Sequence, residues 1–580
     1  MVKSFEVADP IDSSLEGFAL VNPSITLIPA EKILFRKTEK SQIALISGGG
    51  SGHEPTHAGF IGDGMLSAAV CGDIFASPST KQILNAIRLV SENSKGVLLI
   101  VKNYTGDVLH FGLAAERARA QGIDCHVFVV GDDVAVGRAK GGMVGRRALA
   151  GTVLVHKIAG AFAKGYSEKY GLQGTIDAAT IINDNLVTIG SSLEHCKVPG
   201  RKYETSLKGS QLELGMGIHN EPGVQILEPI PSTEELISKY MLPALLDSSD
   251  SDRYFVNFDE GDDVVLLVNN LGGVSNFIIS SIVSIVNKAL KSEYNIVPVQ
   301  SISGTLMTAF NGNGFSITLL NATKATKALN SKFPEIKSVL DLLNYNTTAP
   351  GWAVVSHNSK PAVNEDILKV DVKVKNAGTY DFETFSNWMK AAAKAIKEAE
   401  PHITSLDTQV GDGDCGYTLV AGTEGITDDL DKISKKSLSE ATAQISDIIE
   451  SSMGGTSGGL YSILLSAFSN GIIQTCGENT PVTAKEVAKS LDFALSTLYK
   501  YTKARVGSST MIDALEPFIE EFKKSQDFKK AVAAAAKGAE STGNVEAKFG
   551  RASYVGDSSS VEDPGAVGLV AFLKGIESTF

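Results

Sequence analysis

Cysteine is scarce in this sequence, with five residues among 580: Cys71, Cys125, Cys196, Cys415 and Cys476. They are scattered, their number is odd, and no C-x-x-C pair occurs. This usage argues against a disulfide framework and against a cysteine-rich zinc site. We expect reduced thiols, as in a cytoplasmic protein.

The sequence also lacks long apolar runs and an excess of basic charge. No uninterrupted apolar run reaches the roughly 18–20 residues that a membrane helix needs. The N-terminal residues MVKSFEVADPIDSS do not have the basic-then-apolar pattern of a signal peptide. A formal net charge of -13 argues against a nucleic-acid groove and against an anionic membrane surface. We therefore expect a soluble protein with neither nucleic acid nor membrane as a partner.

The first part of the chain, residues 1–343, alternates short apolar runs with helical patterns. Near-continuous apolar runs of this length are typical of strands buried on both faces, and their alternation with helices predicts α/β architecture. Two of the runs, VLLIVKNYTGD and VVLLVNNLGGV, resemble each other, which fits two α/β subdomains or a chance likeness. The expected strands are 42–47, 96–101, 125–130, 264–268 and 315–320, and the expected helices include 80–91 and 111–121.

The second part of the chain, residues 344–580, differs in its sequence pattern. Residues 344–379 mix Pro, Asn, Ser and Lys without helical periodicity and are predicted to be a linker. From 380 to 580 strand signals almost vanish, and we expect an all-α domain. Its predicted helices are 383–399, 438–452, 458–470, 483–500, 526–541 and 565–577.

A carboxylate loop is the sharpest local feature. Asp407, Asp412 and Asp414 lie in LDTQVGDGDCG, separated by glycines that allow sharp turns. Convergent carboxylates repel one another unless a cation lies between them, and Mg²⁺ prefers such hard oxygen ligands. The calcium-binding EF-hand spacing does not fit. An ordinary Asp-Gly turn is the alternative, but three acids favour a metal site.

Two further loops in the same domain precede helices. MGGTSGG at 453–459 offers free backbone N–H groups and the hydroxyls of Thr456 and Ser457, which favours either phosphate binding or close helix packing. DPGA at 563–566 is fully explained as a helix cap. Neither loop is a Walker A motif.

In the first part, the run 42–47 leads into GGGSGHEPTH, a glycine loop where α/β folds place ligands. His53 and His57 could act as ligands or bases, but Pro55 between them argues against a helical zinc pair. Lys102 and Asp107 follow another strand, where they form either a functional pair or a structural salt bridge.

His219 lies on an irregular loop, ELGMGIHNEPG. A lone histidine is usually an ordinary polar residue. Its neutral imidazole is nevertheless a nucleophile that can add to a ketone.

Seven motifs together resemble the single-chain, yeast-type ATP-dependent dihydroxyacetone kinases, in the same order and across essentially the whole chain: GGGSGHEP, KNYTGD, MGIHNEPG, LDTQVGDGDCG, MGGTSGG, GSSTMIDAL and DPGA. The resemblance implies an N-terminal substrate domain (K domain, 1–343) of two α/β subdomains. It also implies a C-terminal nucleotide domain (L domain, 380–580) built as a barrel of antiparallel helices, after the linker 344–379.

The resemblance also implies roles for individual residues. In the family the histidine of the MGxHxEPG motif, here His219, holds the substrate carbonyl as a hemiaminal. The three acids Asp407, Asp412 and Asp414 correspond to ligands of two Mg²⁺ ions under ATP. The implied substrate contacts are Gly50, Ser51, Gly52, His53, Lys102 and Asp107. The implied nucleotide contacts are Gly413, Asp414, Cys415, Gly416, Thr456, Ser457, Gly507, Met511, Asp563, Pro564 and Gly565. One departure is Ser508-Ser509, where many relatives carry a charged or bulkier pair.

The implied reaction is ATP-dependent phosphorylation of dihydroxyacetone, with glyceraldehyde as a second substrate. Either Asp107 or His53 is the base; we favour Asp107, with His53 orienting the substrate. The family implies a homodimer in which the K domain of one chain faces the L domain of the other. Two alternatives are a lyase that splits FAD to cyclic FMN and a non-catalytic regulatory subunit. The retained His219 loop and the three acids argue against the second. A role in detoxification and one in glycerol assimilation both stay open.

Overall fold

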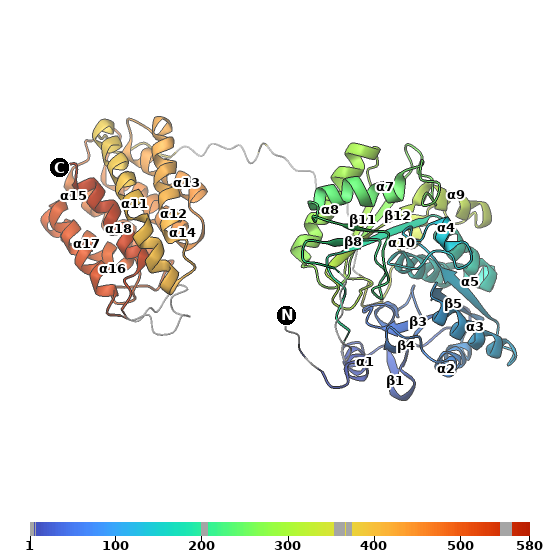
Figure 1. The fold of residues 1–580 in the computed structure, drawn as a ribbon. Helices are drawn as coiled ribbons and strands as arrows, with labels where there is room; N and C mark the ends of the chain where they lie inside the picture. Colours follow the sequence, from blue (N-terminus) through green and yellow to red (C-terminus); the bar gives the residue numbers. More distant parts are fainter. Residues whose placement is uncertain (1–4, 6, 199–206, 353–365, 367–373, 546–559) are drawn as a thin grey trace. The chain divides into compact units, whose positions relative to one another are not determined.

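The structure is a computed structural model that describes residues 5, 7–198, 207–352, 366, 374–545 and 560–580. The chain divides into two compact units, Met1–Lys360 and Pro361–Phe580 (Figure 1). The first unit is α/β and the second is helical, as the sequence predicted. No helix among the described residues is long and apolar enough to cross a membrane.

The first unit contains two six-stranded sheets. In one sheet, with the order β1-β2-β4-β3-β5-β6, the last four strands are parallel and β1 and β2 are antiparallel. The carboxyl ends of the parallel strands therefore meet at one edge, where α/β folds place their ligands. The strands are β1 (Thr26–Ile28), β2 (Ile33–Phe35), β3 (Ile43–Ser51), β4 (Ala68–Ile74), β5 (Gly96–Lys102) and β6 (Cys125–Val130).

Helices α2 and α3 cover one face of this sheet through Ile83, Leu84 and Phe111, among others. The helix α2 matches its predicted bounds, whereas α3 begins six residues earlier than predicted and so takes Asp107 into its first turn. The helical segments here are α1 (Pro10–Val21), α2 (Thr80–Ser91), α3 (Thr105–Arg119) and α4 (Arg138–Gly141), with 3₁₀ turns at Pro29–Glu31 and Ala58–Phe60.

Strand β3 differs from its prediction. It continues through Gly48–Gly50 to Ser51, so these glycines form strand and not loop. The reason is close packing, because a Cβ on Gly48 would lie 2.3 Å from the carbonyl oxygen of Val70 in β4. The glycines let two backbones approach more closely than side chains allow.

The second sheet has the order β11-β10-β12-β7-β8-β9; β10 and β11 pair in parallel and its other described pairs are antiparallel. The two similar runs noted in the sequence thus lie in different sheets, as β5 and β10. The strands are β7 (Leu186–Ser192), β8 (Leu212–Leu214), β9 (Gln225–Leu227), β10 (Val264–Asn270), β11 (Gln300–Gly304) and β12 (Gly314–Asn321). The helical segments are α6 (Thr233–Glu235), a π-helix (Leu236–Met241), α7 (Leu242–Leu246), α8 (Asn276–Tyr294), α9 (Ala322–Lys332) and α10 (Val339–Leu343).

One long helical segment, α5 (Gly151–Asp184), which is kinked at Gly171, joins the two sheets. It packs on β3, β5 and β6 of the first sheet and on β7 and β12 of the second. Its residues 151–163 are all buried, so protein covers this part of the helix on every side. The two α/β halves therefore share one hydrophobic core.

Residues 344–352, here called the exit segment, pack on the first unit. Gly351 donates its N–H to the carbonyl of Gly59 at 2.7 Å, and the Asp63 N–H donates to Thr348 Oγ1 at 2.8 Å. A Cβ on Gly62 would lie 2.2 Å from the Ala349 nitrogen, so the contact requires glycine. The start of the predicted linker is thus attached to the segment that follows His53, and much of the remaining linker lies outside the described residues.

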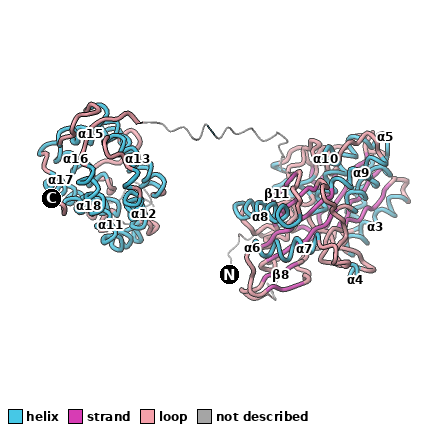
Figure 2. The backbone as a smooth tube through the Cα atoms, turned by 90° about the horizontal axis from the view of Figure 1, so that it is seen from above, coloured by secondary structure: helices cyan, strands magenta, loops and turns pink. Residues whose placement is uncertain are grey.

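Among its described residues, the second unit contains eight α-helices. They form a closed ring (Figure 2). Each helix packs against its neighbour in sequence, and α18 closes the ring against α11. The sequence did not predict α12 and α16 and placed the end of α11 too early. The helices are α11 (Phe382–Val410), α12 (Cys415–Asp428), α13 (Leu438–Ser452), α14 (Gly455–Thr475), α15 (Ala484–Leu498), α16 (Ile512–Ser525), α17 (Phe528–Thr542) and α18 (Pro564–Glu577).

Candidate active site

A pair of histidines faces each other in the first unit. His53 follows β3, and His219 lies in the loop between β8 and β9. Their Nε2 atoms are 2.9 Å apart. On its other nitrogen, Nδ1, His53 lies 2.7 Å from the carbonyl oxygen of Thr308, and His219 lies 2.9 Å from a carboxylate oxygen of Glu221. The fold thus brings together two residues 166 positions apart.

The neighbours of the pair assign its protons. A carbonyl and a carboxylate only accept, so each Nδ1 carries a hydrogen and donates it. The two Nε2 atoms can then be in hydrogen-bond contact only if one further proton lies between them. Burial, followed by the charges of Lys102 and His219, holds the pKa of His53 well below its usual value.

Glu221 stabilises this arrangement. Its second carboxylate oxygen accepts the backbone N–H of His219 at 2.8 Å, so the side chain fixes both the ring and the backbone of that residue. Burial opposes ionisation of Glu221, but the hydrogen bonds and charge of His219 outweigh it and bring the pKa of Glu221 down to about 2. Sequence reasoning missed Glu221 as a site residue, although it lies in the HNEPG motif two positions after His219.

Aromatic rings surround His219. Phe75, just after β4, has its ring centroid 5.2 Å from that of His219, and Tyr104, just after β5, lies at 4.6 Å. Both rings stand nearly perpendicular to the imidazole, at 83° and 89°. Neither residue was predicted, because an isolated aromatic residue after a strand carries no signal of its own.

Lys102 and Asp107 lie beside the glycine segment of β3. A Cβ on Gly49 would lie 3.5 Å from a carboxylate oxygen of Asp107 and 3.7 Å from Cε of Lys102. Lys102 is fully buried, and among the described residues its ammonium has no hydrogen-bond partner. Burial lowers the pKa of Lys102 to about 8. Asp107 accepts a hydrogen bond from Ser77 Oγ at 2.5 Å. A buried cation without a partner is costly unless a ligand supplies one.

The other predicted substrate contacts are backbone positions. A Cβ on Gly50 would lie 2.6 Å from the backbone of Ala76, and the N–H of Gly52 donates to the carboxylate of Glu54. Ser51 is buried, and its hydroxyl donates to the carbonyl of Gly72, so its side chain is already engaged.

His57 does not join the His53–His219 pair. Its Nδ1 lies 3.0 Å from Ser47 Oγ and 3.0 Å from His156 Nε2. Burial holds the pKa of His57 and that of His156 below their usual values, so both rings are neutral. We assign this group to the support of the core beneath β3.

In the second unit, Asp407, Asp412 and Asp414 converge. One carboxylate oxygen from each lies within 4.8 Å of the others. Oδ2 of Asp407 accepts the N–H groups of Asp414 and Cys415 at 2.8 and 3.0 Å, which folds the loop around it and caps α12. A Cβ on Gly411 would collide with this carboxylate at 2.2 Å. Three carboxylates at this separation form a donor set that suits Mg²⁺.

The predicted nucleotide loops lie close to this cluster. Asp563 caps α18 by accepting the N–H of Ala566 at 2.7 Å, and its pKa rises to about 7 through burial and then the charges of Asp513 and Asp407. A Cβ on Gly565 would touch Met511 at 3.6 Å. The structure thus brings together the acidic loop, Met511 and the start of α18.

Asp513 organises the loop that contains Gly507. It is buried, and its carboxylate accepts the N–H of Gly507 at 2.6 Å and that of Thr510 at 2.9 Å. Gly507 has φ +89°, a conformation that favours glycine. Sequence reasoning missed Asp513, whose place in GSSTMIDAL was the available signal.

The MGGTSGG segment starts helix α14, with Gly454 as its N-cap. Gly454, Gly455 and Gly459 face open space, so close packing does not explain them. Thr456 is exposed and Ser457 is half-buried. Free N–H groups at the start of a 21-residue helix suit an anionic group.

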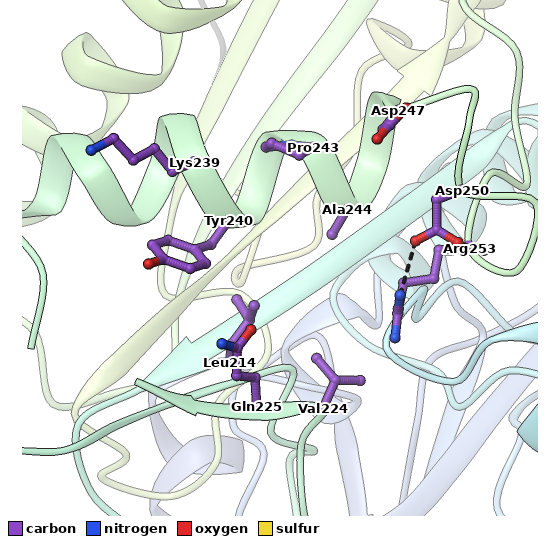
Figure 3. Close-up of a pocket in the computed structure, with 10 residues that line it drawn as sticks. All are labelled: Leu214, Val224, Gln225, Lys239, Tyr240, Pro243, Ala244, Asp247, Asp250 and Arg253. Atoms are coloured by element: carbon purple, nitrogen blue, oxygen red, sulfur yellow. Dashed lines mark hydrogen bonds and ion pairs between the residues drawn. The ribbon is translucent and has the colours of Figure 1, made fainter. Parts of the chain in front are cut away.

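A separate cavity of about 230 Å³ lies at the base of the β8–β9 hairpin (Figure 3). Its charged residues include Asp250 and Arg253, which pair with each other at 2.9 Å. None of the predicted site residues lines it. Its lining is Leu214, Val224, Gln225, Lys239, Tyr240, Pro243, Ala244, Asp247, Asp250 and Arg253.

Comparison with known proteins covers both units. The Dak1 domain matches residues 16–337, and the DAK2 domain matches residues 409–578. The chain is 74% identical over 579 residues to Dihydroxyacetone kinase 1 of Saccharomyces cerevisiae, covering 99% of each chain. It is 36% identical over 592 residues to Triokinase/FMN cyclase of Bos taurus, covering 98% of this chain and 97% of the relative. The structure of the dihydroxyacetone kinase from C. freundii in complex with AMP-PNP and Mg²⁺ matches with a TM-score of 0.69 at 30% identity, covering 100% of both chains.

Proposed function

Because this chain belongs to the dihydroxyacetone kinase family, with a Dak1 domain followed by a DAK2 domain, we propose that His219 binds the substrate covalently during its phosphorylation. The enzyme transfers the γ-phosphate of ATP to dihydroxyacetone and to glyceraldehyde, with Mg²⁺. The observation that carries the covalent step is the 2.9 Å contact between the Nε2 atoms of His53 and His219.

Substrate capture uses the proton that lies between these two nitrogens. With this proton on His53 Nε2, the lone pair of His219 Nε2 attacks C2 of dihydroxyacetone. A C–N bond forms, the C=O π bond breaks, and the carbonyl oxygen takes the proton from His53 Nε2. Glu221 keeps the Nδ1 hydrogen in place and so leaves Nε2 as the nucleophile. Glycerol has no carbonyl and cannot form this bond.

Phosphoryl transfer then needs a base at the terminal hydroxyl of the bound triose. Asp107 is suited to this, because Ser77 holds its carboxylate beside the glycine segment. The buried ammonium of Lys102 donates a hydrogen bond to a substrate oxygen. This oxygen gives the ammonium the partner that it lacks among the described residues. Phosphoryl transfer depends mainly on positioning and electrostatics, which these groups provide.

The second unit holds the nucleotide. Asp407, Asp412 and Asp414 would bind Mg²⁺, which neutralises charge on the phosphates. The N–H groups at Gly454–Ser457 bind phosphate oxygens at the start of α14. Asp513 fixes the conformation of the Gly507 loop by accepting its backbone N–H, and Met511 packs beside Gly565 in the wall of the nucleotide site.

The enzyme acts as a homodimer in the cytoplasm in this proposal. The two sites lie on separate units and must meet for transfer, and a dimer lets the K domain of one chain face the L domain of the other. All five cysteines are free, as is usual for a reducing compartment. Full specific activity of a monomer at high dilution would contradict the dimer.

The first experiment follows ATP consumption with dihydroxyacetone, with glycerol and without an acceptor. The wild type should consume ATP only with dihydroxyacetone. The variant His219→Ala should lose this turnover, and Asp412→Asn should lose turnover but still bind dihydroxyacetone covalently. Equal rates with glycerol, or an unaffected His219→Ala, would contradict covalent capture.

A second activity, the splitting of FAD to cyclic FMN, is favoured by the name of the bovine relative, Triokinase/FMN cyclase. The acid cluster lies on a unit separate from His219. This activity should therefore depend on Asp412 and survive His219→Ala. Release of cyclic FMN from FAD by the two variants tests this directly.

A further inference from the structure

We propose that Phe75 is a specificity-determining residue that limits substrates to three carbons. This inference rests on the proposed covalent capture of the ketone by His219. Phe75 forms a wall of the space around the reacting nitrogen, so a longer ketose has no room beyond the carbon that bonds to His219.

The backbone of Phe75 is held in a conformation that a bulky residue rarely adopts. Its φ is +57°, in the left-handed region that favours glycine and asparagine. Such strain persists only where the surroundings impose it. If position 75 had only a structural role, glycine would relieve this strain. A phenylalanine here therefore indicates that the ring itself is needed.

Two glycines of β3 and its extension hold Phe75 in place. A Cβ on Gly50 would lie 2.7 Å from Cα of Phe75, and one on Gly52 would lie 2.8 Å from the edge of its ring. The N–H of Phe75 donates to the carbonyl of Ser51 at 3.0 Å. The substrate segment and Phe75 thus form one rigid unit, and the glycines are needed partly because the ring is there.

The ring lies against both reacting histidines. It stacks on His53 with centroids 5.0 Å apart and planes 17° apart, and its centroid is 5.2 Å from that of His219. Tyr104 closes another side of His219 at 4.6 Å, and its hydroxyl is tied to the carbonyl of Ala148. His219 is only 18% exposed. Free space near its Nε2 is therefore confined by rings that cannot easily move.

These distances set the size of the substrate. A ketone carbon bonded to Nε2 lies about 1.5 Å from it, and each further carbon adds a bond of similar length. The two terminal carbons of a triose stay next to the bonded carbon. A fourth carbon with its hydroxyl adds a further bond length within a space that the rings of Phe75 and Tyr104 border. Tyr104 is anchored by its hydroxyl, whereas removal of the Phe75 side chain opens the space directly.

The test measures kcat/KM for dihydroxyacetone and for erythrulose, the four-carbon ketose with the same hydroxymethyl ketone end. The wild type should prefer dihydroxyacetone strongly. We expect Phe75→Ala to shift the ratio toward erythrulose by tenfold or more, and Phe75→Leu to shift it less. Covalent binding of each ketose, followed by the ¹³C signal of labelled C2, should change in the same direction. Phe75→Leu keeps an apolar side chain at this position and so controls for a general loss of structure, which would lower both rates together.

Phe310→Ala is the matched control. Phe310 also has a positive φ, +55°, and its N–H donates to the carbonyl of Gly52. Its ring makes no contact with either histidine among the ring contacts of the described residues. This variant should keep the wild-type ratio.

The possible outcomes separate the two proposals. If the wild type phosphorylates neither ketose, the proposed function itself fails. If it phosphorylates dihydroxyacetone and both Phe75 variants keep the wild-type ratio, the role of Phe75 is refuted. A wild type that accepts erythrulose as readily as dihydroxyacetone also refutes it.

Discussion

Glu221→Gln should weaken substrate capture while leaving the fold and the nucleotide site intact. The carboxylate of Glu221 accepts the Nδ1 hydrogen of His219 at 2.9 Å and the backbone N–H of the same residue at 2.8 Å. Glutamine keeps the shape and one neutral acceptor but removes the negative charge. The imidazole then loses the carboxylate that accepts its Nδ1 hydrogen and fixes its tautomer.

The expected magnitude follows from the pKa of Glu221, which the contacts with His219 bring from 4.5 to about 2 against the effect of burial. At 1.36 kcal/mol for each pKa unit this corresponds to about 3 kcal/mol. The side chain is 30% exposed, so solvent screening reduces the figure to about 2 kcal/mol. That value lies within the usual range for a hydrogen bond to a charged group. Covalent capture should therefore weaken by roughly 30-fold.

The assay titrates dihydroxyacetone labelled with ¹³C at C2 into the enzyme without ATP and follows the change from a ketone signal to a tetrahedral-carbon signal. The value of kcat/KM should fall with the affinity of capture, and KM for ATP should stay unchanged. Glu228→Gln is the control, because Glu228 directly follows β9 but pairs with Ser210 and Gln211. If Glu221→Gln captures dihydroxyacetone within twofold of the wild type, the assigned proton arrangement is wrong.

Three further predictions concern separate parts of the chain. Asp513→Asn loses one of its two loop hydrogen bonds, because an amide nitrogen cannot accept, so KM for ATP should rise about tenfold with kcat within threefold; equal KM values would contradict the loop role. Gly62→Ala should lower the free energy of unfolding by about 1–3 kcal/mol, because its Cβ meets the exit segment at 2.2 Å. In the same denaturation assay Gly165→Ala, which faces open space in α5, should raise it by about 0.5–1 kcal/mol. Burial lowers the pKa of Lys102 to about 8, so its ammonium is present below that pH and the rate should fall as the pH rises through 8. Between pH 8 and 10.5, the ordinary pKa of lysine, Lys102 is protonated in the unfolded chain but neutral in the folded protein. The free energy of unfolding therefore rises with pH in this range. In Lys102→Met both the fall in rate above pH 8 and the rise in stability between pH 8 and 10.5 should be absent. If the rate of this variant still falls above pH 8 as in the wild type, Lys102 is not the source.

The amino-acid sequence by itself determined the local structure and the class of the fold. Buried strands appear as apolar runs, so the strands at 96–102 and 125–130 were predicted within one residue. Helices with an amphipathic pattern and a serine cap, such as 80–91, were equally clear. Helices α12 and α16 were missed because their own sequences disfavour a helix: α12 contains three glycines, and α16 contains Pro517 in its interior. The acidic loop was found because all three of its carboxylates lie within eight residues.

Only the tertiary structure decided which residues meet across long separations. The contact between His53 and His219 spans 166 positions, and its proton arrangement depends on Thr308 and Glu221, which no local pattern connects. Nothing in the sequence around Phe75 marks it as a site residue. It lines the site because the parallel strands end at the same edge of the sheet. Periodicity and capping act over a few residues, so the sequence shows them directly. The geometry of a site arises from packing between distant elements, and for that reason only the folded chain contains it.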